Sequence, residues 1–193
     1  MQDTSSDLEL ARSAAQVDEA AFRKIYEATC DRLFSLLCYQ VGDRDEARDL
    51  LQDTYVQAWK RIADYRGEAP LGGWLRMIAL RKAIDWKRGA LRRLKRTVEL
   101  HETTASVETN HDGLSFDSEK ATLHRALQRL SPMQRGALLL REWEEWDFRE
   151  VAHALGCKES TARVHHTRAR EKMRDLLGQV ATLRARGLKG QII

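Results

Sequence analysis

The sequence predicts an all-α protein with two small helical domains joined by a flexible acidic linker. Three observations support this prediction. Only two prolines interrupt the 193 residues, apolar residues recur at the three-to-four spacing of amphipathic helices, and a strongly basic segment is followed at once by an acidic one. With 42% hydrophobic and 32% charged residues, the composition indicates a packed core with a solvated surface.

Three helices are predicted for the first domain. Residues 18–41 form the first, with an apolar face made of Phe22, Ile25, Tyr26, Cys30, Leu33 and Leu37. The second follows Gly42 and packs its apolar stripe on the core, while its opposite face carries Asp45, Asp49, Gln52 and Asp53. The loop RGEAPLGG, with three glycines and a proline, ends this helix, and the third helix begins near Leu71.

The distribution of charge sets the predicted domain boundaries. Between Arg76 and Arg96 there are nine basic residues and one acid, Asp85, whereas Thr97 to Glu119 contains six acids and no lysine or arginine. About 20 flexible residues span roughly 25 Å, which is enough to separate two domains. We therefore predict a first domain at 1–96, an acidic linker at 97–119, a second domain at 120–177 and a basic tail at 178–193.

Start and stop signals define the helices of the second domain. Ser131 and Pro132 supply an N-cap and a proline at the first helical position. Asp147 can cap the next helix and Gly156 can end it, so that residues 148–168 fit a helix-turn-helix. The second helix of such a unit can enter the major groove of DNA. The alternative is a plain helical hairpin with a basic, solvated face.

Neither a metal site nor a catalytic site is expected. The neighbouring histidines His165 and His166 point about 100° apart on a helix, so they cannot converge on one ion. The acidic stripe of the second helix is convex and interrupted by Arg44 and Arg48, whereas a metal-dependent nuclease or hydrolase needs a concave site. The chain has no phosphate-binding glycine loop and no nucleophile elbow. We therefore expect no enzyme activity and no cofactor.

Cysteine usage and hydropathy indicate the compartment. The three cysteines show no CxxC spacing, which fits a reducing cytoplasm better than a disulfide framework. The amino-terminal segment MQDTSSDLELARSAAQ is polar and lacks the apolar core of a signal peptide. No apolar run approaches membrane-spanning length, so a cytoplasmic protein without membrane insertion is expected.

The basic third helix is typical of nucleic-acid binding. Its positive charges would repel one another unless a polyanion lay alongside, and Trp74 and Trp86 are interleaved among them. Phosphate contacts combined with aromatic faces for unstacked bases are how single-stranded or melting DNA is held. Trp74 also lies in an apolar stripe, so a core position and a stacking position both stay open for it.

Three segments of the chain resemble the extracytoplasmic-function (ECF) type of bacterial RNA polymerase sigma factor, group 4 of the sigma-70 family. They are DEARDLLQDTYVQAW (similar to region 2.2), YRGEAPLGGWLRMIALRKAIDWKR (regions 2.3 and 2.4) and LSPMQRGALLLREWEEWDFREVAHALGCKESTARVHHTRAREKMRDLL (region 4). The resemblance covers residues 18–177. It implies a helical region 2 bundle and a region 4 helix-turn-helix. The implied function is to bind core RNA polymerase, recognise the −10 and −35 promoter elements and aid promoter melting.

The resemblance also implies which residues bind each partner. The clamp of the largest polymerase subunit would be bound through Asp49, Gln52 and Asp53. The −10 element would be contacted by Arg66, Glu68, Leu71, Trp74, Arg81, Lys82, Lys87 and Arg88. The −35 element would be contacted by Thr161, Arg163, Val164, His165, Thr167 and Arg168. An anti-sigma factor is a further implied partner, although no residue identifies it.

Three positions depart from the family pattern. Arg81 stands where the family usually has asparagine, and His165 stands where the recognition helix usually has a second arginine. His166 replaces an apolar residue and follows Ala162 by four positions, so we predict that it faces the core of the helix-turn-helix while His165 faces outward.

Two other classes of protein were weighed against a sigma factor. A helix-turn-helix regulator would act on duplex operators, often as a dimer, without being a polymerase subunit. An adaptor or anti-factor would have no contact with DNA and would leave the basic helix unexplained. The acidic stripe on one helix next to a basic helix favours the sigma factor.

Overall fold

The computed structural model describes residues 4–100 and 118–189, and every regular element in these two ranges is a helix. The chain divides into two compact units, Met1–His111 and Asp112–Ile193, which confirms the predicted all-α fold with two helical domains. The middle of the predicted linker, 101–117, lies outside the described residues. Its two ends do not: 97–100 complete one helix and 118–119 begin the next. No helix in the described ranges is both long enough and apolar enough to cross a membrane.

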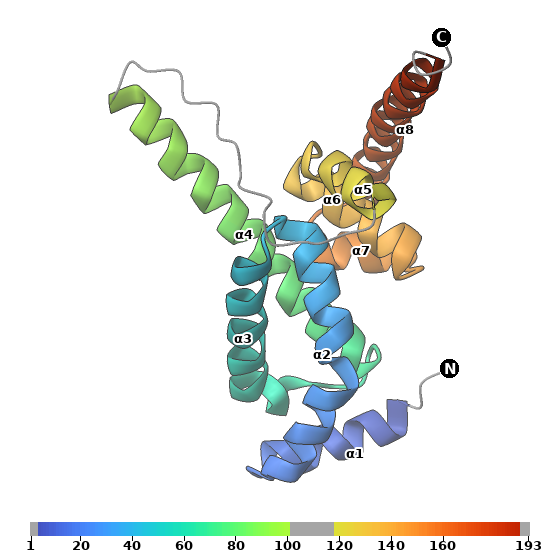
Figure 1. Cartoon of the computed structure of the whole chain (residues 1–193). Coiled ribbons are helices and arrows are strands. Elements are labelled where there is room, and N and C mark those ends of the chain that lie inside the picture. The colour runs from blue at the N-terminus through green and yellow to red at the C-terminus, as the bar shows by residue number, and fades with distance from the viewer. Residues whose placement is uncertain (1–3, 101–117, 190–193) are drawn as a thin grey trace. The chain divides into compact units, whose positions relative to one another are not determined.

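The first unit is built from four helices and one short 3-10 turn. These are α1 (Thr4–Ala15), α2 (Glu19–Val41), α3 (Arg44–Arg61), η1 (Ile62–Asp64) and α4 (Leu71–Leu100). Helices α2, α3 and α4 pack against one another in all three pairs, and α1 lies against α2, η1 and the start of α4 (Figure 1). The core between them is aliphatic at its centre, where Leu37, Ala47 and Leu75 are fully buried.

Local sequence explains how α2 and α3 begin and end. Asp18 and Asp43 are the N-caps, and each carboxylate accepts two backbone N–H groups of the first turn of its helix. Gly42 ends α2 with a φ of 89°, in the left-handed region that glycine adopts without strain. A chain reversal of two residues thus separates two long helices, and α2 and α3 are held as an antiparallel pair.

Helix α1 was not predicted from the sequence. It buries Ala11 and Ala14 on α2 and η1, and Leu8 lies over the loop before α4. A Cβ atom added to Gly67 would come within 2.7 Å of the Leu8 side chain, which would have to move, and the φ of 74° also favours glycine there. The polar composition of residues 4–15 hid this helix, because its two small buried residues give only a weak apolar face.

The second unit contains the predicted helix-turn-helix. Its elements are α5 (Ser118–Gln128), α6 (Pro132–Leu138), a π-helical turn η2 (Leu139–Trp143), α7 (Phe148–Leu155) and α8 (Glu159–Lys189). Ser131 and Asp147 are N-caps with complete capping boxes, and Gly156 ends α7 with a φ of 63°, as the sequence predicts. The predicted basic tail, 178–193, continues α8 as far as residue 189.

Arg135 is a charged residue in the core of the second unit, with 1% of its surface exposed. Its Nε donates to the carbonyl of Leu127 at 2.7 Å, its Nη2 to the carbonyl of Leu130 at 3.1 Å, and its Nη1 to the side chain of Gln128 at 2.7 Å. The Leu127 carbonyl, in the last turn of α5, thus accepts from this guanidinium as well as from the backbone N–H of Leu130, and the Leu130 carbonyl just beyond the helix gains a donor. Burial lowers the pKa of Arg135 to about 10, which still leaves it charged at neutral pH.

Candidate polymerase and nucleic-acid interfaces

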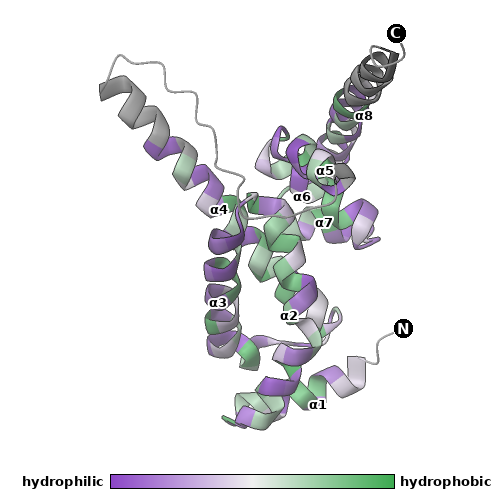
Figure 2. Cartoon of the chain, viewed as in Figure 1, coloured by the Kyte–Doolittle hydropathy of each residue, from purple (hydrophilic) through white to green (hydrophobic). Residues whose placement is uncertain are grey.

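The acidic stripe predicted on α3 is exposed. Asp49, Gln52 and Asp53 all lie on the solvent side of the helix, while Leu50 and Leu51 face the core. Figure 2 shows α3 largely in the colour of hydrophilic residues. Two members of the stripe have partners within the unit: Lys82 Nζ of α4 lies 3.6 Å from Asp53 Oδ2, and Arg48 Nη1 lies 2.7 Å from Asp45 Oδ1. Asp49 and Gln52 therefore form the most open part of the predicted polymerase-binding face.

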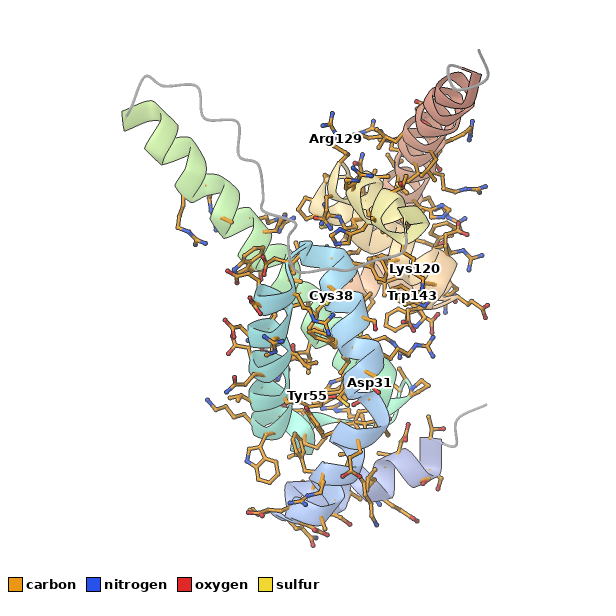
Figure 3. The ribbon with its side chains drawn as sticks, in the orientation of Figure 1. Asp31, Cys38, Tyr55, Lys120, Arg129 and Trp143 are labelled. Atoms are coloured by element: carbon orange, nitrogen blue, oxygen red, sulfur yellow. The ribbon has the colours of Figure 1, made fainter. Side chains whose placement is uncertain are left out.

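An aromatic groove adjoins this stripe. A cavity of about 550 Å³ opens between α2 and α3, and Gln52 belongs to both the stripe and the groove. Its apolar lining, called the aromatic groove below, comprises Phe22, Tyr26, Leu51, Tyr55, Val56 and Trp59. Tyr55, labelled in Figure 3, extends from α3 to α2, where its hydroxyl lies 2.7 Å from that of Thr29.

The groove corrects part of the predicted core. Tyr26 was assigned to the buried face of its helix but is 44% exposed, and Val56 and Trp59 are 47% and 36% exposed. Phe22 packs edge-on against Trp59, with ring centroids 4.8 Å apart. The sequence did hold a signal for this surface, because Val56 and Trp59 follow Gln52 at helical spacing and so lie on the same side of α3.

The loop before α4 places some of the predicted −10 residues at the surface and one in the core. Arg66 and Glu68 are exposed, and the Tyr65 hydroxyl fixes the loop by donating to the carbonyl of Ala69 at 2.6 Å. Leu71 is only 4% exposed and belongs to the core cluster. Its side chain therefore packs in the core of the unit, and its contact with DNA stays a prediction.

Trp74 is half-buried: part of its ring packs in the core and part is exposed, so the stacking role stays a prediction. Its ring lies 5.7 Å from that of Tyr65, and it packs against the core of the unit. Burial, together with the negative charge of Asp7, raises the pKa of Tyr65 to about 12, so its hydroxyl stays neutral. The exposed remainder of the indole is the only part of Trp74 that a base could stack on.

The basic residues of α4 differ in how openly they present their charge. Arg81 and Arg88 are exposed, with Arg88 Nη1 4.0 Å from Asp85 Oδ1, whereas Lys82 is less exposed and lies near Asp53 of α3. Lys87 donates to the carbonyl of Val41 at 2.7 Å and so caps the last turn of α2. A side chain that closes a helix end also has a structural role, and Lys87 is therefore the least free of the predicted −10 contacts.

The two faces of α8 have opposite characters. Ala162, His166, Ala169 and Met173 are buried, at the spacing of one helix face. The residues predicted to reach the −35 element lie elsewhere: Thr161, Arg163, Val164, Thr167 and Arg168 are exposed, and His165 is half-exposed. The prediction that His166 faces the core is confirmed. The exposed face holds two arginines and two threonines, which can donate hydrogen bonds to phosphates or base edges.

The two histidines of α8 have different surroundings. His166 Nε2 lies 2.7 Å from Glu142 Oε1 of the π-helical turn, and a carboxylate can only accept this bond. The imidazole also packs edge-on against Phe148. Burial, and then the positive charge of Arg168, lowers the pKa of His165, so it is neutral at neutral pH. His165 therefore offers a hydrogen-bonding group where an arginine would offer a charge.

Arg163 is held by two contacts. Its Nη2 and Nε atoms lie 2.6 and 3.2 Å from Glu159 Oε1, and its guanidinium carbon is 4.4 Å from the centroid of the Phe148 ring.

No cluster of three or more His, Cys, Asp or Glu side chains suited to a metal ion occurs in the part of the chain that the structure describes.

The fold and these surfaces define a two-domain helical protein of the helix-turn-helix class. Two family models match the chain: Sigma-70 region 2 over residues 25–97 and Sigma-70, region 4 over residues 120–173. RNA polymerase sigma factor CarQ of Myxococcus xanthus is 30% identical over 163 residues, covering 83% of this chain and 91% of CarQ. RNA polymerase sigma-H factor of Pseudomonas aeruginosa is 26% identical over 177 residues, covering 86% and 90%.

Solved structures agree with these matches. CnrH, in a structure with the cytosolic domain of CnrY, aligns with a TM-score of 0.65 and 25% identity over 92% of this chain and 99% of that one. The sigma factor RpoE from Bartonella quintana, in a complex with the anti-sigma factor NepR, aligns with a TM-score of 0.64 and 23% identity over 81% and 96%. The chain belongs to the ECF sigma factors of the sigma-70 family. Its function is that of an RNA polymerase sigma factor in transcription initiation.

Proposed function

We propose that each predicted partner binds a separate surface of the chain: core polymerase on α3, the −10 element on α4 and its preceding loop, and the −35 element on α8. The observation that supports this most directly is the exposure of an acidic face and a basic helix side by side on one unit. Opposite charges on neighbouring helices suit two partners of opposite charge, a basic protein surface and DNA.

The polymerase-binding face would consist of Asp49, Gln52 and Asp53 together with the aromatic groove. Charged side chains guide association, while buried aromatic contacts supply most of the affinity of a protein interface. A groove lined by Val56 and Trp59 beside an acidic stripe offers both. The partner would be a basic segment with an apolar side chain that enters the groove, on the clamp of the largest polymerase subunit.

The −10 element would be bound by Arg66, Glu68, Trp74 and the exposed arginines Arg81 and Arg88, with Lys82 and Lys87 contributing charge nearby. These residues lie on one helix and the loop that leads into it, so they can follow a single strand of DNA. The −35 element would be read in the major groove by the exposed face of α8, with Arg163 and His165 at base edges and Thr161 and Arg168 at phosphates.

Neither catalysis nor constant activity is part of the proposed role. The chain would have no catalytic activity of its own, since its role is to position the polymerase. It would also be held inactive in the cytoplasm by an anti-sigma factor, as the sigma factor RpoE of Bartonella quintana is found in a complex with the anti-sigma factor NepR.

Transcription by reconstituted holoenzyme tests the proposal. Bacterial core polymerase with the full chain should transcribe selected members of a promoter library, and core polymerase alone should not. Replacing Asp49 and Asp53 with lysine should abolish core binding in a pull-down while circular dichroism shows an intact fold. Glu9→Lys, an exposed acid on α1 of the same unit, is the matched control and should bind normally.

Two results would reject the assignment. Core binding by the double lysine variant would remove the role of α3. Specific binding of duplex DNA by the chain alone, without any dependence on polymerase, would favour the helix-turn-helix regulator instead.

A further inference from the structure

Phe148, the first residue of α7, belongs to none of the predicted interfaces. Its ring nevertheless contacts Arg163, which is predicted to read a base, and His166, which stands where the family usually has an apolar residue. We propose that Phe148 is a positioning residue, which holds the Arg163 guanidinium in the orientation that reads one base pair of the −35 element. The inference rests on the proposed function, because it assigns a task within the reading of DNA by α8.

The Arg163 side chain is already ordered by two neighbours in the free protein. An arginine side chain on an exposed helix face samples many rotamers, and about 2 kcal/mol of rotamer entropy opposes its ordering. Here the guanidinium carbon of Arg163 lies 4.4 Å from the centroid of the Phe148 ring, and its Nη2 donates to Glu159 Oε1 at 2.6 Å. A side chain that is already ordered in the free protein loses less entropy when it binds DNA.

The Phe148 ring is itself held in place by several contacts. Phe148 follows the N-cap Asp147, whose capping box fixes the backbone at the start of α7. His166 packs edge-on against the ring with centroids 5.3 Å apart, and Glu142 holds His166 in turn. The guanidinium carbon of Arg141 also lies over the ring, at 5.3 Å. The Phe148 ring, which packs against Arg163, is therefore held by contacts from both the π-helical turn and α8.

The remaining donors of Arg163 indicate which base it reads. A guanidinium has five N–H donors, and Glu159 engages one on Nε and one on Nη2. Both donors of Nη1 and the second donor of Nη2 are left on the outer edge. Two parallel donors at this spacing match the O6 and N7 acceptors of guanine in the major groove. The Phe148 ring and the Glu159 carboxylate thus orient Arg163 for contact with a G·C pair.

The test uses holoenzyme, made from core polymerase and the full chain, on promoters in which each G·C pair of the −35 element is replaced in turn. Arg163→Ala should lose discrimination at one pair by about 5- to 150-fold, the fold-change equivalent to about 1–3 kcal/mol. Phe148→Leu should lose roughly 2- to 5-fold at the same pair, as expected from the loss of a cation–π contact. Phe148→Tyr keeps an aromatic face and should keep the discrimination.

A double-mutant cycle separates positioning from folding. If Phe148 acts through Arg163, then Phe148→Leu should cause no further loss of discrimination when Arg163 is already alanine. Met173→Ala, which truncates a buried residue further along α8, should lower thermal stability without changing base discrimination. Phe148→Met replaces Phe148→Leu in the cycle if the leucine variant does not fold.

The inference is overturned if Phe148→Leu weakens all promoters equally, or if it still reduces discrimination in the Arg163→Ala background. A different result identifies a failure of the proposed function: discrimination that survives Arg163→Ala would show that Arg163 does not read the −35 element, and the positioning role would fall with it. The Arg163→Ala variant alone therefore distinguishes the two failures.

Discussion

The carboxylate of Asp7 accepts a hydrogen bond from the backbone N–H of Leu71 at 2.8 Å, across 64 positions of sequence. Helix α1 thus caps the first turn of α4, the helix that carries the predicted −10 contacts. The same carboxylate helps to raise the pKa of Tyr65, whose hydroxyl closes the loop between the two helices. The amino-terminal helix is therefore a structural support of the predicted −10 surface, although it lies outside the residues that match the region 2 family model.

Removing this cap should destabilise the first unit. Asp7→Ala leaves an unpaired N–H at the start of α4 and is expected to lower the free energy of unfolding by about 1 kcal/mol, as for other N-caps. Asp7→Asn keeps an acceptor and should lose much less. Urea unfolding followed by circular dichroism measures both, and equal stability of the alanine variant would contradict the capping role.

Replacement of Arg135 should be the most damaging single change in the second unit. Arg135→Leu leaves the Leu130 carbonyl without its Arg135 donor and removes one of the two donors to the Leu127 carbonyl, and it is expected to reduce stability by about 2 kcal/mol. Arg129→Leu removes the same charge from an exposed position, labelled in Figure 3, and should change stability little. A loss of similar size in the two variants would mean that charge, and not the buried hydrogen bonds, determines the effect.

The aromatic groove should contribute to polymerase affinity. Trp59→Ala removes a large exposed side chain from its lining and should weaken core binding roughly tenfold, because tryptophans often dominate interface energetics. Trp59→Phe keeps an aromatic surface there and should bind nearly as well as the parent. Fluorescence anisotropy with labelled chain and core polymerase measures both dissociation constants. Unchanged affinity of the alanine variant would restrict the interface to the acidic stripe.

His165→Arg should increase the electrostatic part of DNA binding. Because the pKa of His165 is lowered by burial and by Arg168, the parent side chain is neutral at neutral pH and releases no counterion there. An arginine at this position would neutralise about one more DNA phosphate. The slope of log affinity against log salt concentration would then become steeper by about 0.9. Holoenzyme–promoter affinities at several salt concentrations give the slope. An unchanged slope would place residue 165 away from DNA.

The Cys38 thiol should resist modification and should link stability to alkaline pH. Burial raises the pKa of Cys38 to about 11 from an ordinary value near 9. The unfolded chain therefore loses this proton first, so stability is complete below pH 9 and is lost as pH rises toward 11. Cys38→Ala should flatten that decline. Thiol labelling at pH 8 should modify Cys30 and Cys157 before Cys38, since both are more exposed.

Local signals in the sequence predicted the helix-turn-helix well. The caps at Ser131, Asp147 and Gly156 depend only on neighbouring residues, and all three form as predicted. The inward direction of His166 follows from its four-residue spacing from Ala162, so it too could be predicted. A resemblance of three segments to known sigma factor regions then led to the family that the comparisons confirm.

Features that depend on distant contacts could not be predicted in this way. Burial of Leu71 requires α1, whose position is fixed by a residue far away in the sequence. Tyr26 has the correct helical spacing for the core, yet the space beside it is left open between α2 and α3. An arginine in a sequence is normally expected at the surface, and only the folded α5 shows why Arg135 lies inside.

The lengths of α6 and α7 have a consequence for how DNA reading is lost. With 7 and 8 residues, both are shorter than the ~12–15 residues that an isolated helix needs for even marginal stability in water. Neither can persist without packing against α8, and Arg135 of α6 binds the end of α5. The support beneath the predicted −35 face of α8 should therefore be lost in a single all-or-none transition, and a partly unfolded second unit would no longer hold that face in place.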